Sequence, residues 1–150
     1  MPREYPSAPL PSVGAVICSG DKVLLVRRGH EPSKGKWSIP GGVMELGETI
    51  RETARREVME ECGVEIEAGE VVEVRDAIVR DETGRIRFHY VLVDVIARYV
   101  SGDLRAGSDV EDARWVSKED VTKFDLSPDL PPLLRSCREK CNLDFPAHQG

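Results

Sequence analysis

The sequence predicts an α/β or α+β sandwich built as one compact domain. Two observations support this fold class. Apolar, β-branched runs typical of strands alternate with segments that carry helix start and stop signals, and this alternation favours a sheet covered by helices. The 150 residues, 40% of them hydrophobic, are enough to form one hydrophobic core that is stable without disulfide bonds or structural metal ions.

The first part of the chain is expected to form a proline-rich arm and then two strands. Residues 1–11 hold four prolines, so they cannot form a central strand and are expected to run as a loose arm. Residues 12–18 and 22–28 are apolar and β-branched around a Ser-Gly-Asp turn, which predicts a pair of neighbouring strands. A loop is expected at residues 29–36.

A glycine-rich turn and a helix are predicted next. One proline and three glycines between residues 40 and 47 favour tight backbone geometry ahead of a helix that runs from residue 48 or 49 to Cys62. Gly63 is expected to end this helix at the position where glycine most often does so.

The second half of the chain is predicted to contain a long hairpin followed by short elements. Residues 65–81 and 85–100 have strand patterns and are joined by a Glu-Thr-Gly turn. The remaining expectations are a loop at 101–112, a strand at 113–116, a Ser-capped helix at 117–124 and a helix at 127–140. The domain should then span residues 12–140, with a frayed tail at 141–150.

Composition and charge exclude several classes of protein. The net charge of −6 argues against a partner that is nucleic acid or a membrane surface, because such binders usually carry a basic excess. The longest apolar run, residues 91–97, is interrupted by Asp94 and is far too short to span a bilayer. The four cysteines follow no secretory leader, so they are interpreted as reduced thiols of a cytoplasmic protein. Cys137 and Cys141 lack the second ligand pair of a zinc site.

Three glutamates crowd one turn of the predicted helix. At 100° per residue, Glu57, Glu60 and Glu61 fall within an arc of about 100°, and like charges so placed destabilise a helix. Glu57 and Glu61 also border the apolar stripe of the helix rather than its solvated face. A partly desolvated carboxylate cluster needs neutralisation, and hard divalent cations such as Mg²⁺ or Mn²⁺ prefer oxygen ligands. A solvated, glutamate-rich helix face is the alternative.

The context of these glutamates decides between the two interpretations. Residues 42–64 contain Gly42, Glu48, Arg56, the three glutamates and Gly63 at fixed spacings, with Val58 and Val64 at the two aliphatic positions. This pattern resembles the Nudix box, G-x5-E-x7-R-E-U-x-E-E-x-G-U, in which U is a bulky aliphatic residue, and every defined position is filled. The resemblance extends over about residues 12–135.

The resemblance implies a Nudix-type α/β/α sandwich with a mixed β-sheet. It also implies Mg²⁺-dependent hydrolysis, with Mn²⁺ as a substitute, of a nucleoside diphosphate linked to another group. The metal ligands that it implies are Glu57, Glu60, Glu61 and the main-chain carbonyl of Gly41. Glu48 and Arg56 are expected to orient these carboxylates, as outer-shell groups do. The family does not place the general base uniformly, so its identity stays open among the glutamates and an acid on another loop.

Further site residues are expected outside the box. Members often supply an acid just before the segment that matches Arg114-Trp115-Val116, and the candidates are Asp109, Glu111 and Asp112, with Glu111 preferred. Arg27 and Arg28 can bind phosphate, but neighbours on a strand point to opposite faces, so one should reach the site, and Arg28 is favoured. Trp37 is expected either to stack on a nucleobase or to pack in the core. His89 is interpreted as structural rather than catalytic.

The sequence indicates the type of reaction more firmly than it indicates the substrate. The overall pattern resembles ADP-ribose pyrophosphatase and MutT-like members, and ADP-ribose is favoured, with AMP and ribose 5-phosphate as products. The proline and tyrosine that mark two known subgroups beyond the box are both missing. The alternatives are a nucleotide-sanitising nucleoside triphosphate pyrophosphohydrolase and a non-catalytic nucleotide sensor. A homodimer that uses the proline-rich arm is compatible with the sequence.

Overall fold

The computed structural model describes residues 2–107 and 109–144. Its elements are, in chain order, β1 (Leu10–Ser19), β2 (Lys22–Arg28), β3 (Trp37–Ser38), β4 (Gly41–Val43), α1 (Ile50–Cys62), β5 (Glu65–Arg80), β6 (Ile86–Ser101), β7 (Val110–Ser117), the 3₁₀ turn η1 (Val121–Lys123) and α2 (Leu130–Asp144). Within the described residues, no helix is both long enough and apolar enough to cross a membrane.

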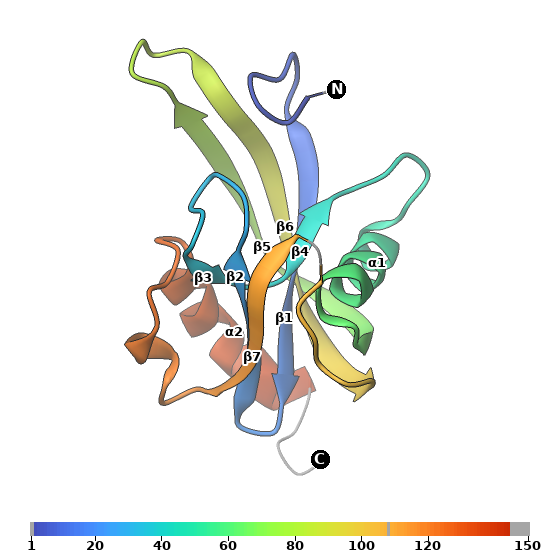
Figure 1. Ribbon diagram of the computed structural model, residues 1–150. Helices are drawn as coiled ribbons and strands as arrows, with labels where there is room; N and C mark the ends of the chain where they lie inside the picture. Colours follow the sequence, from blue (N-terminus) through green and yellow to red (C-terminus); the bar gives the residue numbers. More distant parts are fainter. Residues whose placement is uncertain (1, 108, 145–150) are drawn as a thin grey trace.

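The strands form one mixed sheet that lies between the two helices (Figure 1). The main order is β3-β2-β1-β6-β5, while β4 pairs with β1 and β7 pairs with β2. Only the β1–β6 pair is parallel among the described strands, and the other pairs are antiparallel. The predicted α/β/α sandwich with a mixed sheet is confirmed.

The central strand β1 is apolar on both faces because each face is covered by a helix. Val13 and Ile17 belong to the cluster that contains the apolar side of α1. Val16, on the other face, belongs to the cluster that contains Leu130 and Leu133 of α2. Side chains that alternate between two buried faces explain why the strand reads as a continuous apolar run.

Helix α1 begins and ends where the sequence predicts. The side chain of Thr49 accepts a hydrogen bond from the backbone N–H of Glu52, and the side chain of Glu52 accepts one from the backbone N–H of Thr49. This reciprocal capping satisfies two N–H groups at the start of the helix. Gly63 ends it with φ = 72°, a left-handed conformation that glycine adopts without steric cost. The β5–β6 hairpin is confirmed as well.

Several predicted boundaries are wrong. Strand β1 begins at Leu10 instead of residue 12, and Pro11 lies inside it, where its carbonyl accepts a hydrogen bond from the backbone N–H of Met44. A proline lacks the donor but keeps the acceptor, so it fits this position of the ladder. Strand β7 begins at Val110, so two of the candidate loop acids are strand residues. The short strands β3 and β4 were not expected.

The C-terminal segments also differ from the prediction. Residues 117–124 contain only the short turn η1 instead of a helix, because the chain must turn back to pair with Trp37, whose backbone N–H donates to the carbonyl of Asp125. Helix α2 starts at Leu130, after Pro128, and includes residues 141–144 that were expected to be frayed. Residues 145–150 lie outside the described residues.

Candidate active site

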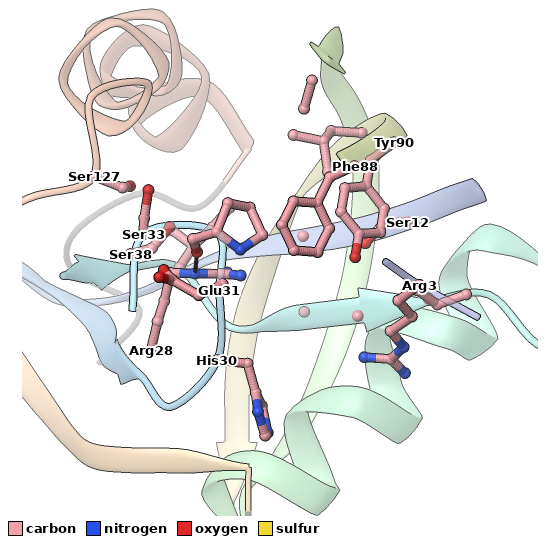
Figure 2. Close-up of a pocket in the computed structure, with 18 of the residues that line it drawn as sticks. Arg3, Ser12, Arg28, His30, Glu31, Ser33, Ser38, Phe88, Tyr90 and Ser127 are labelled. Carbon is pink, nitrogen blue, oxygen red and sulfur yellow. Dashed lines mark hydrogen bonds between the residues drawn. The ribbon is translucent and has the colours of Figure 1, made fainter. Parts of the chain in front are cut away.

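The described residues line a cavity of about 600 Å³ (Figure 2). It lies beside the β5–β6 hairpin, which projects from the sheet (Figure 1). Residues from β1, β2, β4, β5, β6 and α1 line it, together with the loop that follows β2. Carboxylates of α1 lie at one end of the cavity, and Arg75, Asp94 and Asp129 lie on its wall as well.

Two of the three predicted glutamates lie at the wall of this cavity and are nearly buried. Glu57 and Glu61 are each 9% exposed, and both line the cavity. Glu60 points outward, with 55% of its side chain exposed. The helix places the first two beside the apolar stripe formed by Ala54 and Val58, which are fully buried.

Arg56 connects four carboxylates. Its Nε and Nη2 donate to the two oxygens of Glu48 at 2.6 and 3.0 Å. Its Nη1 donates to Glu57 at 3.0 Å and to Glu60 at 3.3 Å. Nη2 also donates to the carbonyl of Val43 in β4, which ties the helix to the turn before it. Nη1 also forms an ion pair with Glu45 at 3.7 Å. One guanidinium therefore faces four carboxylates, so the cluster keeps an excess of negative charge.

The pKa values divide the carboxylates into two kinds. Hydrogen bonds from Arg56 lower the pKa of Glu48 to about 2. Burial raises the pKa of Glu61 to about 8, and the negative charge of Glu57 acts in the same direction. Burial also raises the pKa of Glu57, against the effect of Arg56. Arg56 therefore compensates the charge of Glu57 only in part, and within the described residues Glu61 forms no ion pair.

Two glycines of β4 allow these carboxylates to approach the sheet. The backbone N–H of Gly41 donates to Oε1 of Glu61 at 2.8 Å. A Cβ atom on Gly42 would overlap the carboxyl group of Glu57. The tight turn that the sequence predicts is thus needed for contact with α1 as well as for its own geometry.

Gly42→Ala is expected to lower activity about 10- to 100-fold. The new methyl group displaces the Glu57 carboxylate, and the loss should match that seen when a group that orients a metal ligand is removed. The melting temperature should change little, since the backbone of Gly42 is not left-handed. Steady-state kinetics and thermal unfolding measure the two effects. In a Glu57→Gln background the same change should have almost no additional effect on activity, and a fully additive loss would contradict this explanation.

The structure separates the two arginines at the end of β2. Arg28 lines the cavity, and its Nε donates to the carbonyl of Pro32 at 2.7 Å (Figure 2). Arg27 lies outside the lining and forms an ion pair with Glu111 at 3.4 Å. The strand geometry explains this, because consecutive side chains leave opposite faces.

Two expectations need correction. Of the loop acids, Asp109 lines the cavity, whereas the preferred candidate Glu111 does not. Trp37 is 7% exposed, packs edge-on against Phe124 in the α2 cluster and is absent from the lining. Its ring belongs to the core, because β3 places it under α2, and it is not available to stack on a nucleobase.

A buried ion pair in the cavity wall was not predicted from the sequence. Asp94 is 1% exposed and accepts hydrogen bonds from Nε and Nη2 of Arg75, at 2.7 and 3.2 Å. Arg75 also pairs with Asp129, before α2. The signal was present, because Asp94 interrupts an otherwise apolar strand, and a charge at such a position is rarely buried without a partner. Its partner on β5 could not be read from the sequence.

A comparison with protein families identifies the group to which the chain belongs. The model of the NUDIX domain matches residues 8–137, which is most of the chain. The chain belongs to the Nudix family. The resemblance that residues 42–64 indicated is therefore confirmed.

Individual Nudix proteins are similar to this chain in sequence and structure. It is 32% identical to the ADP-ribose pyrophosphatase of Methanocaldococcus jannaschii over 116 residues, which cover 77% of this chain and 66% of that protein, slightly less than two thirds of its length. It is 30% identical to the nucleoside triphosphatase NudI of an Enterobacter species over 103 residues, 62% of this chain and 70% of that protein. The NUDIX domain of Shewanella oneidensis NrtR complexed with ADP ribose matches with a TM-score of 0.71, 28% identity and 89% of each chain.

The Nudix helix of this chain fits a divalent cation in the chemistry of its donors. Glu57 and Glu61 present nearly buried carboxylate oxygens, the first shared with Arg56, and hard cations prefer such oxygen ligands. As they stand, the described residues contain no three acidic, histidine or cysteine side chains grouped tightly enough to hold a metal. Glu60, the third glutamate of the helix, is largely exposed and accepts a hydrogen bond from Nη1 of Arg56 at 3.3 Å.

In metal-free protein, Glu61→Gln is expected to raise the melting temperature, and more so at higher pH. Folded Glu61, with a pKa of about 8, keeps a proton that the unfolded chain loses near pH 4.5, so stability falls as pH rises between these values. The amide side chain of Glu61→Gln does not titrate, so this loss of stability with rising pH disappears, and its oxygen still accepts a hydrogen bond from the Gly41 N–H. We expect little change at pH 5 and a gain of about 5 °C at pH 9. Thermal unfolding in EDTA measures it; Glu60→Gln, an exposed control, should show no such trend.

Proposed function

We propose that this Nudix chain hydrolyses the phosphoanhydride bond of a nucleoside diphosphate derivative, with Mg²⁺ as cofactor and Mn²⁺ as a substitute. ADP-ribose is the favoured substrate. Water adds to one phosphorus atom and the P–O–P bridge breaks, which gives AMP and ribose 5-phosphate. The observation that carries the proposal is the buried pair Glu57 and Glu61 at the wall of a cavity that arginines also line.

The residues of the cavity have separate roles in this proposal. Glu57, Glu60, Glu61 and the carbonyl of Gly41 would hold the cation. When bound, a divalent cation supplies positive charge to the phosphates and lowers the pKa of a water molecule. Arg56 and Glu48 position the carboxylates of the helix through the hydrogen bonds described above.

The phosphate groups need cationic partners from the protein as well. Arg28 lines the cavity and carries a planar guanidinium suited to two phosphate oxygens. Asp109 takes the place expected for Glu111 as the loop acid beside the helix, since it lines the cavity and its charge acts on Glu61. The general base is one of this set of acids: Glu57, Glu60, Glu61 and Asp109.

ADP-ribose is preferred over a nucleoside triphosphate because of the proteins that this chain resembles. The similar proteins include an ADP-ribose pyrophosphatase and a NUDIX domain complexed with ADP ribose. The cavity of about 600 Å³ falls within the size range usual for small-molecule sites, about 300–1,000 Å³, and suits either substrate. Similarity to a nucleoside triphosphatase supports the pyrophosphohydrolase as the second candidate.

A product-resolved screen tests the proposal. Purified chain is incubated with Mg²⁺ or Mn²⁺ and with ADP-ribose, other nucleoside diphosphate derivatives or nucleoside triphosphates, and the products are separated by chromatography. AMP and ribose 5-phosphate in equal amounts support the proposed reaction. Pyrophosphate and a nucleoside monophosphate from a triphosphate would favour the second candidate. Metal-dependent binding of ADP-ribose without any product over hours would favour the sensor.

A further inference from the structure

The segment before β1 is folded against the tip of the β5–β6 hairpin. The backbone N–H of Tyr5 donates to the carbonyl of Arg87 at 2.7 Å, and its hydroxyl donates to Asp81 at 2.9 Å. Glu4 accepts a hydrogen bond from Nε of Arg87 at 2.6 Å. The guanidinium of Arg85 lies over the ring of Tyr5, 4.2 Å from its centroid. Residues 2–6, here named the N-terminal strap, are thus held at several points.

Tyr5 adopts a backbone conformation that non-glycine residues rarely take. Its φ is +51°, in the left-handed region. Such a residue persists when its surroundings determine its conformation, and here the contacts to Asp81, Arg85 and Arg87 do so. The turn at Tyr5 directs the preceding residues toward the cavity, where Arg3 and Glu4 are part of the lining.

Arg3 lines the same cavity as Glu57, Glu61 and Tyr90. Its positive charge acts to lower the pKa values of Glu57 and Tyr90, against the effect of burial. Figure 2 shows Arg3 on the same side of the cavity as Tyr90 and Ser12, across from Arg28.

The other arginines beside it have partners in the protein. Arg75 pairs with Asp94 and Asp129, and Arg87 pairs with Glu4. Within the described part of the chain, Arg3 makes no hydrogen bond or ion pair. A guanidinium that lines the cavity, on a backbone held at the next two residues, is available to an anionic ligand.

We propose that the N-terminal strap forms one wall of the substrate site and that Arg3 binds a phosphate oxygen of the substrate. Arg3 and Arg28 would then contact the diphosphate from opposite sides of a cavity that Glu57 and Glu61 also line. This inference rests on the proposed function, because it needs a substrate that carries phosphate in this cavity. It assigns a binding role to a segment that the sequence predicts to be a loose arm.

The test uses Arg3→Ala in the full chain, with any purification tag at the C-terminus. At saturating Mg²⁺ the KM for ADP-ribose should rise about 10- to 100-fold, as expected for loss of a hydrogen bond to a charged group, while kcat changes less than about twofold. Arg3→Lys should recover part of the affinity, because it keeps the charge. Arg135→Ala removes an exposed arginine of α2 and serves as the matched control, with an unchanged KM.

A second measurement separates this inference from the proposed function. Binding of inorganic pyrophosphate in the presence of Mg²⁺ is measured by calorimetry, which requires no turnover. Weaker binding by Arg3→Ala than by Arg135→Ala supports the role of Arg3 even if wild-type protein hydrolyses none of the substrates in the screen. Equal pyrophosphate affinity in the two variants, with an unchanged KM wherever turnover occurs, would overturn it.

The strap itself can be tested through its anchor. Tyr5→Phe removes the hydroxyl that donates to Asp81 but keeps the ring under Arg85. The KM should rise by less than in Arg3→Ala. The double variant should show less than the sum of the two effects, because Tyr5→Phe acts on the KM through the position of Arg3. Fully additive effects would show that Tyr5 does not position Arg3.

Discussion

Glu61→Gln and Glu60→Gln are each expected to lower kcat by about 100-fold or more. Residues that only orient a metal ligand usually cost about 10- to 100-fold when they are lost. Each change keeps the size of the side chain and removes one negative charge from the proposed cation site. Folding should be retained, because the chain loses repulsion in the metal-free state. The measurement is initial rates at several Mg²⁺ concentrations, together with circular dichroism of each variant.

The two variants should differ in how they respond to metal. Glu60 is largely exposed and pairs weakly with Arg56, so more Mg²⁺ should restore part of the activity of Glu60→Gln. Glu61 is buried at the cavity wall, so Glu61→Gln should recover less. Glu82→Gln, which removes a negative charge from an exposed hairpin turn, is the control and should behave as wild type. Wild-type activity in either site variant would refute the assignment of these glutamates.

Arg56→Met should affect both stability and activity, because Arg56 holds the carboxylates of the site together. Removal of one partner from a partly buried ion-pair network leaves the others without a cation, and we expect a loss of about 3 kcal/mol in the free energy of unfolding. Activity should fall well below that of Arg56→Lys, in which one charge remains but the two-pronged contact with Glu48 is lost. Urea unfolding and steady-state kinetics measure these effects.

The stability loss should depend on pH in a specific direction. The pKa of Glu48 is lowered by Arg56 to about 2, so their interaction stabilises the protein above the ordinary carboxyl pKa near 4.5 and is lost as pH falls toward 2. The difference between wild type and Arg56→Met should therefore be largest near neutral pH and shrink in acid. Arg55→Met, on the exposed side of the helix, should cost less than about 1 kcal/mol. An equal loss at both positions would contradict the role of Arg56.

The local parts of the fold were predictable because local chemistry determines them. The capped helix that ends at Gly63 and the long hairpin follow from spacing, capping residues and turn residues. The 3₁₀ turn at residues 121–123 was not predictable. The segment that follows it pairs with Trp37 through Asp125, and this tertiary contact overrides the local helix signal. Pro11 inside β1 is a similar case, where the position in the ladder decides whether a proline fits.

The site residues also fall into those that local sequence predicts and those that depend on tertiary structure. Arg56 contacts Glu57 on its own helix and Glu48 just before that helix, as the spacing and the family pattern imply, and Glu57 and Glu61 line one cavity. The choice between Asp109 and Glu111 depends on the register of β7 against β2, which no local pattern specifies. Arg3 and Arg75 reach the cavity through contacts between segments that lie far apart in the sequence, so only the tertiary structure could reveal them.

Titration calorimetry of divalent cations tests the central claim most directly. The account predicts that wild-type protein takes up Mg²⁺ or Mn²⁺ in the presence of ADP-ribose or another nucleotide, and that Glu61→Gln binds the same ions much more weakly. Folded wild-type protein that takes up neither ion, with or without nucleotide, would contradict it.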